Sequence, residues 1–197
     1  MRPHLSISRR TSRTPFSSRV EAAGATGYTV YNHTLLATSF RGTEVDYWHL
    51  CENVQVWDVS CEKQVILMGP GANQLAQYMT PRDLSNAQVG RCYYLPMCDE
   101  NGSMISDGVG IKINDRHWRL SVADSDVLLW AKGLAVGFGL DVEVREPEMF
   151  PLAVQGPKAE ELMCRVFGDN IKELGFFAIA PFIYNGKRMK VARSGWS

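Results

Sequence analysis

The chain has 197 residues, of which 45% are hydrophobic and 21% are charged, and its formal net charge is zero. These values are typical of globular proteins and unlike those of disordered chains. A balanced charge argues against a nucleic-acid or membrane-surface partner, and the longest apolar run, residues 176–183, is too short to cross a bilayer. We therefore expect a soluble globular protein of one or two domains.

The first twenty residues contain five arginines, many serines and no acidic residue. This composition is typical of a mitochondrial transit peptide. The segment nevertheless continues without a boundary into residues 24–31, which have the pattern of a folded strand. We therefore favour a bacterial cytoplasmic protein with a basic arm, with a mitochondrial location as the alternative.

Hydrophobic periodicity predicts short helices inserted between groups of strands. Thr43 and Asp46 have the spacing of a capping box, and Asp124 or Ser125 is suited to cap a later helix. Trp48 and Trp130 are predicted to be core residues on the apolar faces of these two helices. The predicted strands are 54–59, 63–68, 92–97, 104–113, 117–122, 140–145, 151–154, 179–184 and 188–193, and the predicted helices are 43–53, 72–79, 125–136 and 157–167.

Asparagine–glycine pairs at 101–102 and 185–186 favour tight hairpins, because both residue types tolerate positive φ. Hairpin-paired strands with inserted helices predict an α+β fold with mainly antiparallel sheets and flanking helices. Residues of about 1–50 and 140–197 are predicted as one subdomain and about 51–139 as a second. No glycine-rich phosphate-binding loop occurs.

Cysteine and histidine spacing favours no metal site, and we predict none. The four histidines are scattered, and no CxxC pair occurs. Free thiols in a reducing cytosol are expected, with a disulfide or metal site as the alternative. The five cysteines are Cys51, Cys61, Cys92, Cys98 and Cys164.

Four short motifs occur in the order found in a known family. They are Trp57–Ser60, the hairpin from Tyr94 to Asp107, Leu152–Pro157 and Arg193–Ser197. Together they resemble the folate-binding domain of the aminomethyltransferase family, which includes the T-protein of the glycine cleavage system. Finer details resemble the dimethylsulfoniopropionate demethylase branch of that family; they lie at 13–16, 27–33, 123–126 and 195–197.

The resemblance implies a three-domain fold with folate in a central channel. The chain ends within the family's glycine-loop motif, so we expect an N-terminal fragment that lacks a C-terminal jelly-roll domain. The same resemblance implies tetrahydrofolate as the methyl acceptor. No nucleic-acid or membrane partner is expected, and a homodimer is possible.

Site residues follow from the resemblance. Asp107 is the catalytic candidate. The residues implied to contact folate are Tyr94, Asp107 and Arg193, and those implied to contact the substrate are Trp196, Tyr31 and Ser121. Each has a structural alternative, such as a cross-strand aromatic pair for Tyr94, a satisfied core serine for Ser121 and a strand end for Arg193.

Two positions depart from the glycine-cleavage pattern. The paired aspartates of that family are Ser106 and Asp107 here, and the asparagine that follows a later strand is Ala123. Loss of one acid favours simple methyl displacement over proton transfer to an amine. Ala123 places one family folate contact in doubt.

Three functions are compatible with these residues. The first is a tetrahydrofolate-dependent demethylase of a small sulfonium acid. The second is a glycine-cleavage aminomethyltransferase. The third is a non-catalytic folate-binding protein that assists iron–sulfur protein maturation, although the cysteine loop typical of that relative is not found.

Overall fold

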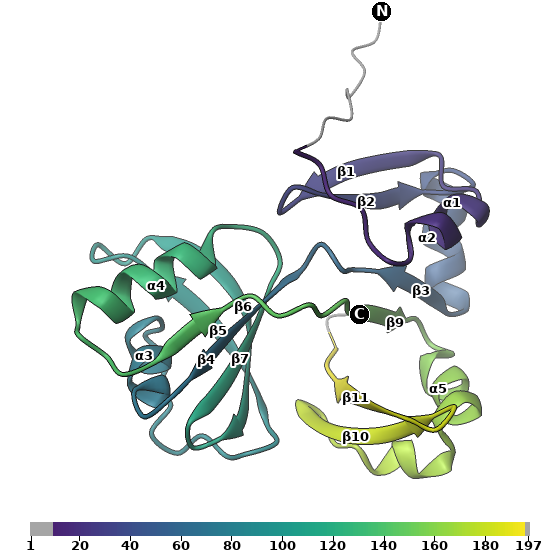
Figure 1. Cartoon of the computed structure of the whole chain (residues 1–197). Helices are drawn as coiled ribbons and strands as arrows, with labels where there is room; N and C mark the ends of the chain where they lie inside the picture. The colour runs from purple at the N-terminus through teal and green to yellow at the C-terminus, as the bar shows by residue number, and fades with distance from the viewer. Residues whose placement is uncertain (1–9, 196–197) are drawn as a thin grey trace, which may run out of the picture.

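The structure is a computed structural model and describes residues 10–195. These residues form one five-stranded sheet and three two-stranded sheets, in which every strand pair is antiparallel (Figure 1). The predicted α+β class with mainly antiparallel sheets is therefore confirmed. Within residues 10–195, none of the helices has the length and apolar character that a membrane span requires.

The five-stranded sheet has the strand order β5-β6-β7-β4-β8. Two helices, α3 (Ala72–Tyr78) and α4 (Val127–Gly137), pack on one of its faces and enclose the larger apolar core with it. Figure 1 shows these helices on the side of the sheet away from the three small sheets. The strands are β4 (Lys63–Met68), β5 (Cys92–Cys98), β6 (Met104–Asn114), β7 (His117–Val122) and β8 (Glu143–Arg145).

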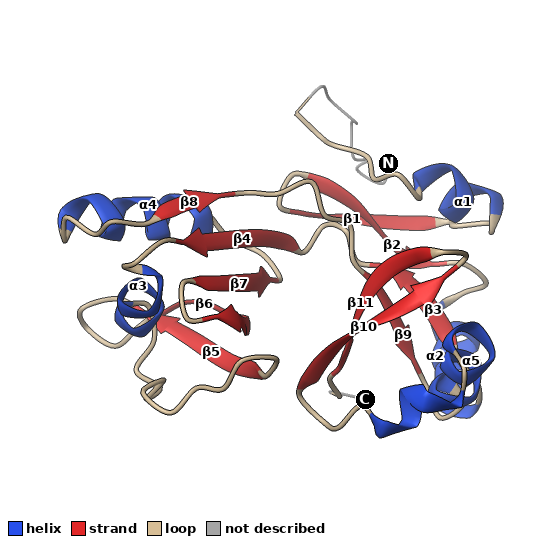
Figure 2. Ribbon diagram, turned by 60° about the horizontal axis from the view of Figure 1, so that its bottom comes forward, coloured by secondary structure: helices blue, strands red, loops and turns tan. Residues whose placement is uncertain are grey.

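One of the three small sheets joins segments that lie far apart in sequence. The middle sheet pairs β3 with β9, which are about a hundred residues apart, and the other two are local hairpins, β1–β2 and β10–β11 (Figure 2). A second apolar cluster, built around Ile171, Leu174 and Phe182, stabilises the last hairpin. The remaining elements are α1 (Ser17–Ala22), β1 (Gly27–Tyr31), β2 (Thr34–Ser39), α2 (Thr43–Glu52), β3 (Gln55–Asp58), β9 (Leu152–Gln155), α5 (Ala159–Phe167), the 3-10 helix η1 (Asp169–Glu173), β10 (Ala178–Tyr184) and β11 (Lys187–Arg193).

β7 shows why the two faces of the large sheet differ. Successive side chains of a strand point to opposite faces, and apolar and polar residues alternate along this strand. Trp118, Leu120 and Val122 are almost fully buried against the helices. His117, Arg119 and Ser121 therefore lie on the opposite face, which we call the inner face; its other members in register are Gln64, Ile66, Tyr94, Asp107, Val109 and Ile111.

Both predicted asparagine–glycine turns are present. Asn185 and Gly186 have φ values of 49° and 75° and connect β10 to β11, as a type I′ hairpin requires. Gly102 lies in the β5–β6 turn with a φ of 81°. A further two-residue turn, Asn32 and His33, connects β1 to β2 with both φ values positive.

Two predictions about helix starts are wrong. Helix α2 begins at Thr43 as expected, but Gly42 is its N-cap and no side chain caps it. Asp46 instead accepts hydrogen bonds from the backbone N–H groups of Phe40 and Arg41, at 2.8 and 3.2 Å. Asp46, the acid of the predicted capping box, therefore orders the loop that precedes the helix.

The prediction that Trp48 is a core residue is also wrong, because the residue is 55% exposed.

The later helix, α4, has Asp126 as its N-cap, again without a side-chain bond. Asp124 accepts a hydrogen bond from the backbone N–H of Asn32 at 2.9 Å, and the backbone N–H of Ser125 donates to Asn32 Oδ1 at 3.0 Å. Both expected caps are thus used in a tertiary contact with the β1–β2 turn. Trp130, in contrast, packs against the core as predicted.

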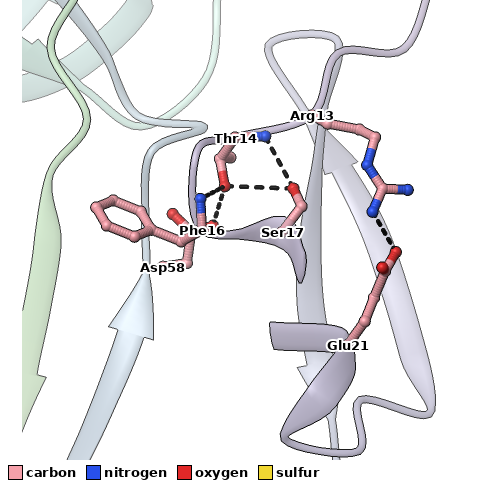
Figure 3. A network of polar contacts seen from close by, with 6 residues as sticks. All are labelled: Arg13, Thr14, Phe16, Ser17, Glu21 and Asp58. Atoms are coloured by element: carbon pink, nitrogen blue, oxygen red, sulfur yellow. Dashed lines mark hydrogen bonds and ion pairs between the residues drawn. The ribbon is translucent and has the colours of Figure 1, made fainter. Parts of the chain in front are cut away.

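A polar network attaches the N-terminal segment to β3 (Figure 3). The Thr14 hydroxyl donates to Asp58 Oδ2 and accepts from the backbone N–H of Phe16 at 3.1 Å. The other Asp58 oxygen accepts from the Ser60 hydroxyl at 2.6 Å. Because Thr14 is buried, its hydroxyl has no alternative partner in water.

The predicted division of the chain into two subdomains stays a prediction.

We expect Thr14→Val to lower the free energy of unfolding by about 1.5–3 kcal/mol, because it removes the hydrogen bond to the partly buried carboxylate of Asp58 while keeping the shape of the side chain. Chemical denaturation would measure the change. Thr38→Val, on the exposed edge of β2, is the matched control and should change stability by less than about 0.5 kcal/mol. Equal effects of both substitutions would contradict this role for Thr14.

Candidate functional site

The inner face carries a row of paired side chains across four strands. Tyr94 of β5 pairs with Val109 of β6, Val109 with Ser121 of β7, and Ser121 with Gln64 of β4. Directly paired residues of neighbouring strands point to the same face. Two of the predicted site residues, Tyr94 and Ser121, are therefore on one surface, two strands apart.

Asp107 joins this surface through a diagonal contact. It lies two residues before Val109 on β6, and its Oδ2 accepts a hydrogen bond from the Tyr94 hydroxyl at 3.0 Å. Diagonal positions on an antiparallel pair are within reach of an aromatic side chain. The hydrogen bond to Asp107 is the main reason that the pKa of Tyr94 is raised; partial burial and the negative charge of Asp107 add to the effect.

Ser121 is oriented by a glutamine. Gln64 Nε2 donates to Ser121 Oγ at 2.7 Å, from a side chain that is itself buried. A hydroxyl that accepts in this way still has its own hydrogen available. Ser121 can therefore act as a hydrogen-bond donor towards a carboxylate or carbonyl oxygen on the inner face.

Glu62 directly precedes β4, and its backbone oxygen accepts a hydrogen bond from Gln64 Nε2 at 3.3 Å. Burial raises the pKa of its carboxyl group. Arg119, on β7, is 8% exposed, and burial lowers the pKa of its guanidinium. The inner face thus holds the Asp107 carboxylate near one end and a buried cation towards the His117 end.

Ser106 does not share the surface of Asp107. It pairs with Met97, whose side chain lies in the core, and its hydroxyl donates to the backbone oxygen of Asp124 at 3.3 Å. Neighbouring residues on a strand point to opposite faces. A serine at this position therefore removes no acid from the inner face, and the expected chemical meaning of that departure is not supported.

The region of Ala123 is occupied by a side chain from another sheet. Asn32 Nδ2 donates to the backbone oxygens of Ala123 and Cys61, at 2.9 and 3.0 Å. This contact fixes the β1–β2 turn against the end of β7. Tyr31 is 38% exposed and precedes Asn32, the residue whose side chain contacts this end of the inner face.

Arg193 lies apart from this surface. Its guanidinium forms an ion pair with Glu160 at 3.0 Å and donates to the backbone oxygen of Leu174 at 3.3 Å. These contacts join β11 to α5 and η1. Its predicted folate contact stays a prediction. Trp196 lies outside the described residues.

No group of three or more metal-binding side chains occurs in residues 10–195. Burial raises the pKa of Cys61 and of Cys92 to about 11. Thiols with such values are protonated at neutral pH and are poor nucleophiles.

Sequence reasoning missed Gln64, Glu62 and Arg119. Gln64 interrupts the apolar run of β4, and Arg119 is part of the alternation of polar and apolar residues in β7, which was a detectable signal. The pairing of Gln64 with Ser121 was not detectable, because 57 positions separate them.

Comparison with known proteins gives consistent matches. The family model of the GCVT N-terminal domain matches residues 16–197. The dimethylsulfoniopropionate demethylase DmdA of Ruegeria pomeroyi is 50% identical over 96% of this chain, which covers 52% of that protein. An aminomethyltransferase of Alcanivorax borkumensis is 32% identical over 79% of this chain and 44% of that protein.

A solved structure gives the same fold. The crystal structure of the glycine cleavage system aminomethyltransferase T from Bartonella henselae matches with a TM-score of 0.79 at 21% identity, over 94% of this chain and 50% of that chain. The chain thus spans about half the length of the relatives that it matches.

We expect Tyr94 to ionise at a higher pH than free tyrosine, and Asp107→Asn to bring its pKa back towards about 10 by removing the carboxylate. The stabilising contribution of the neutral hydroxyl should be complete below about pH 10 and be lost as the pH rises through the higher folded-state pKa. NMR of ring-labelled tyrosine would measure it. Asp115→Asn, in the exposed β6–β7 turn, should leave the Tyr94 titration unchanged; an identical titration in Asp107→Asn would contradict the coupling.

Proposed function

Because the chain belongs to the family of the GCVT N-terminal domain, as its motifs predicted, we propose that the protein transfers a methyl group from a small sulfonium acid to tetrahydrofolate. The methyl donor is dimethylsulfoniopropionate or a close analogue. The main support for this branch is the 50% identity with the Ruegeria pomeroyi demethylase over nearly the whole chain.

The observation that carries the proposal is the shared surface of Tyr94, Asp107 and Ser121. A hydroxyl–carboxylate pair and an oriented donor hydroxyl lie on one face of a rigid sheet, with the core packed behind them. Side chains held by packing on regular strands keep their geometry better than side chains on loops. Such a surface suits the alignment of two small molecules.

The residues present fit a reduced pterin. The ring presents N–H donors, and the hydrogen bond from the Tyr94 hydroxyl occupies only one carboxylate oxygen of Asp107. A carboxylate is the strongest acceptor for such donors. When bound, tetrahydrofolate would supply the ring nitrogen that accepts the methyl group.

The bond changes require little from the protein. As the methyl group leaves, the electrons of the sulfur–carbon bond remain on sulfur as a lone pair and give a neutral thioether, and the accepting nitrogen releases its proton to solvent or to a base. Alignment of the reactants is the main contribution, worth up to roughly 7–11 kcal/mol in the best cases. Aromatic faces also attract a sulfonium cation, by about 0.5–2 kcal/mol each, a role that we assign to Tyr31 and Trp196.

A second candidate is the aminomethyltransferase activity, which the 32% identity with the Alcanivorax borkumensis protein supports. The two are separated by incubating the intact protein with tetrahydrofolate and either dimethylsulfoniopropionate or an aminomethyl-lipoyl protein. Methyltetrahydrofolate formed from the sulfonium supports the first proposal. Product from the lipoyl protein alone supports the second and rejects the first.

We further propose a cytoplasmic location, with the arginine-rich N-terminus as the reason for the mitochondrial alternative. A homodimer without nucleic-acid partners is our working assembly. Sedimentation of the intact protein would test this state.

We expect Asp107→Asn to lower kcat/KM for methyl transfer by about 10- to 100-fold, because a hydrogen bond to a charged group contributes about 1.5–3 kcal/mol. Steady-state kinetics with varied tetrahydrofolate would measure the loss. The control Asp115→Asn removes an equal charge from the exposed end of the same hairpin and should change kcat/KM less than about twofold. Unchanged kinetics in Asp107→Asn would remove Asp107 from the site.

A further inference from the structure

Arg119 is an unusual residue for the middle of a sheet. Its cross-strand partners on the inner face are Ile111 and Ile66, which are 6% and 5% exposed, and Cys92 follows in the same row. The guanidinium therefore lies among buried apolar side chains, and the residue itself is 8% exposed. Arginine is almost never this buried without a partner.

No such partner occurs in the part of the chain that the structure describes. Arg119 Nε is buried without a hydrogen-bond acceptor, and none of the ion pairs within residues 10–195 includes Arg119. The acid on the adjacent edge strand, Glu143, is engaged with Arg145 at 2.9 Å.

The groups around Arg119 are themselves cations or neutral donors. Burial lowers the pKa of Lys190 on β11, and repulsion by Arg119 and then by Arg188 lowers it further. Burial also lowers the pKa of His117 on β7, and repulsion by Arg119, Lys190 and Arg145 adds to this effect. His117 Nε2 is also buried without a partner among the described residues. A guanidinium does not lose its proton in proteins, so this surface carries an uncompensated positive charge.

We propose that Arg119 anchors a carboxylate-binding site on the inner face. The planar guanidinium matches a carboxylate with two parallel hydrogen bonds. Ser121, two residues further along β7, lies on the same face, and its hydroxyl can donate because its oxygen accepts from Gln64. His117 Nε2, two residues in the other direction, is a third polar group on the same line.

This site rests on the proposed function, which supplies two molecules with carboxylates. One is the sulfonium acid, and the other is tetrahydrofolate, through its glutamate. Arg119 and Ser121 are one step of about 6.5–7 Å apart along the strand, and the Tyr94 row coincides with the Ser121 row. A carboxylate bound at Arg119 thus places the rest of its molecule towards Tyr94 and Asp107.

The test uses the intact protein with Arg119→Met, which removes the charge, and Arg119→Lys, which keeps the charge but loses the planar fork. Arg116→Met is the matched control, since Arg116 is exposed in the β6–β7 turn. Four ligands are compared: dimethylsulfoniopropionate, the carboxylate-free trimethylsulfonium, tetrahydrofolate, and a tetrahydropterin without glutamate. Both KM and calorimetric Kd are measured.

We expect Arg119→Met to weaken one carboxylate ligand by about 10- to 100-fold, Arg119→Lys to weaken it less, and Arg116→Met to change it less than twofold. Selective loss for dimethylsulfoniopropionate over trimethylsulfonium assigns the site to the methyl donor. Selective loss for tetrahydrofolate over the tetrahydropterin assigns it to folate. Equal loss for ligands with and without a carboxylate, or no loss, overturns the proposal.

Two further readouts separate this site from folding and from the proposed activity. The ligand-free Arg119→Met protein should have a thermal midpoint no lower than that of the parent, because a buried unpaired charge is replaced by an apolar side chain; a lower midpoint with unchanged binding also overturns the proposal. If the parent protein forms no methyltetrahydrofolate from any sulfonium, the proposed function fails. Calorimetry with 3-(methylthio)propanoate and with tetrahydrofolate still tests the Arg119 site in that case.

Discussion

The alternation of apolar and polar side chains along β7 is the constraint on which the site depends. Trp118, Leu120 and Val122 are held by the core under α3 and α4, so the strand cannot shift by one residue without exchanging the two faces. The same register presents His117, Arg119 and Ser121 to the inner face. The free energy that stabilises the core therefore also orders the polar surface, and no separate loop is needed to position it.

Contacts between the sheets extend this order beyond β7. Asn32 connects the β1–β2 turn to Ala123 and Cys61, and the backbone N–H of Cys92 donates to the carbonyl of Phe177 at 2.7 Å. The first contact holds one end of the inner face and the second holds the edge strand β5 near β10. These bonds join segments far apart in sequence, so they tie the β1–β2 turn and the start of β10 to the large sheet.

Local signals in the sequence predicted the elements well and the side-chain partners poorly. The Asn185–Gly186 turn requires only two residues with positive φ, so its prediction needed no knowledge of the rest of the chain. The caps expected at Thr43 and Asp124 failed, since a capping side chain can be taken by a distant backbone group, as Asn32 takes Asp124. Ser121 was predicted as a substrate contact, but the residue that orients it was not predicted, because Gln64 is adjacent only in the folded sheet.

The distribution of charge on the inner face has a chemical consequence. Asp107 lies towards one end of the strands, and Arg119 lies two rows away towards the other. A molecule with a cationic sulfur and a carboxylate is attracted in one orientation by such a surface and repelled in the reverse orientation. Burying the Arg119 charge without a partner destabilises the ligand-free protein. The same charge binds the carboxylate of the ligand, so the residue that lowers stability also provides the selectivity.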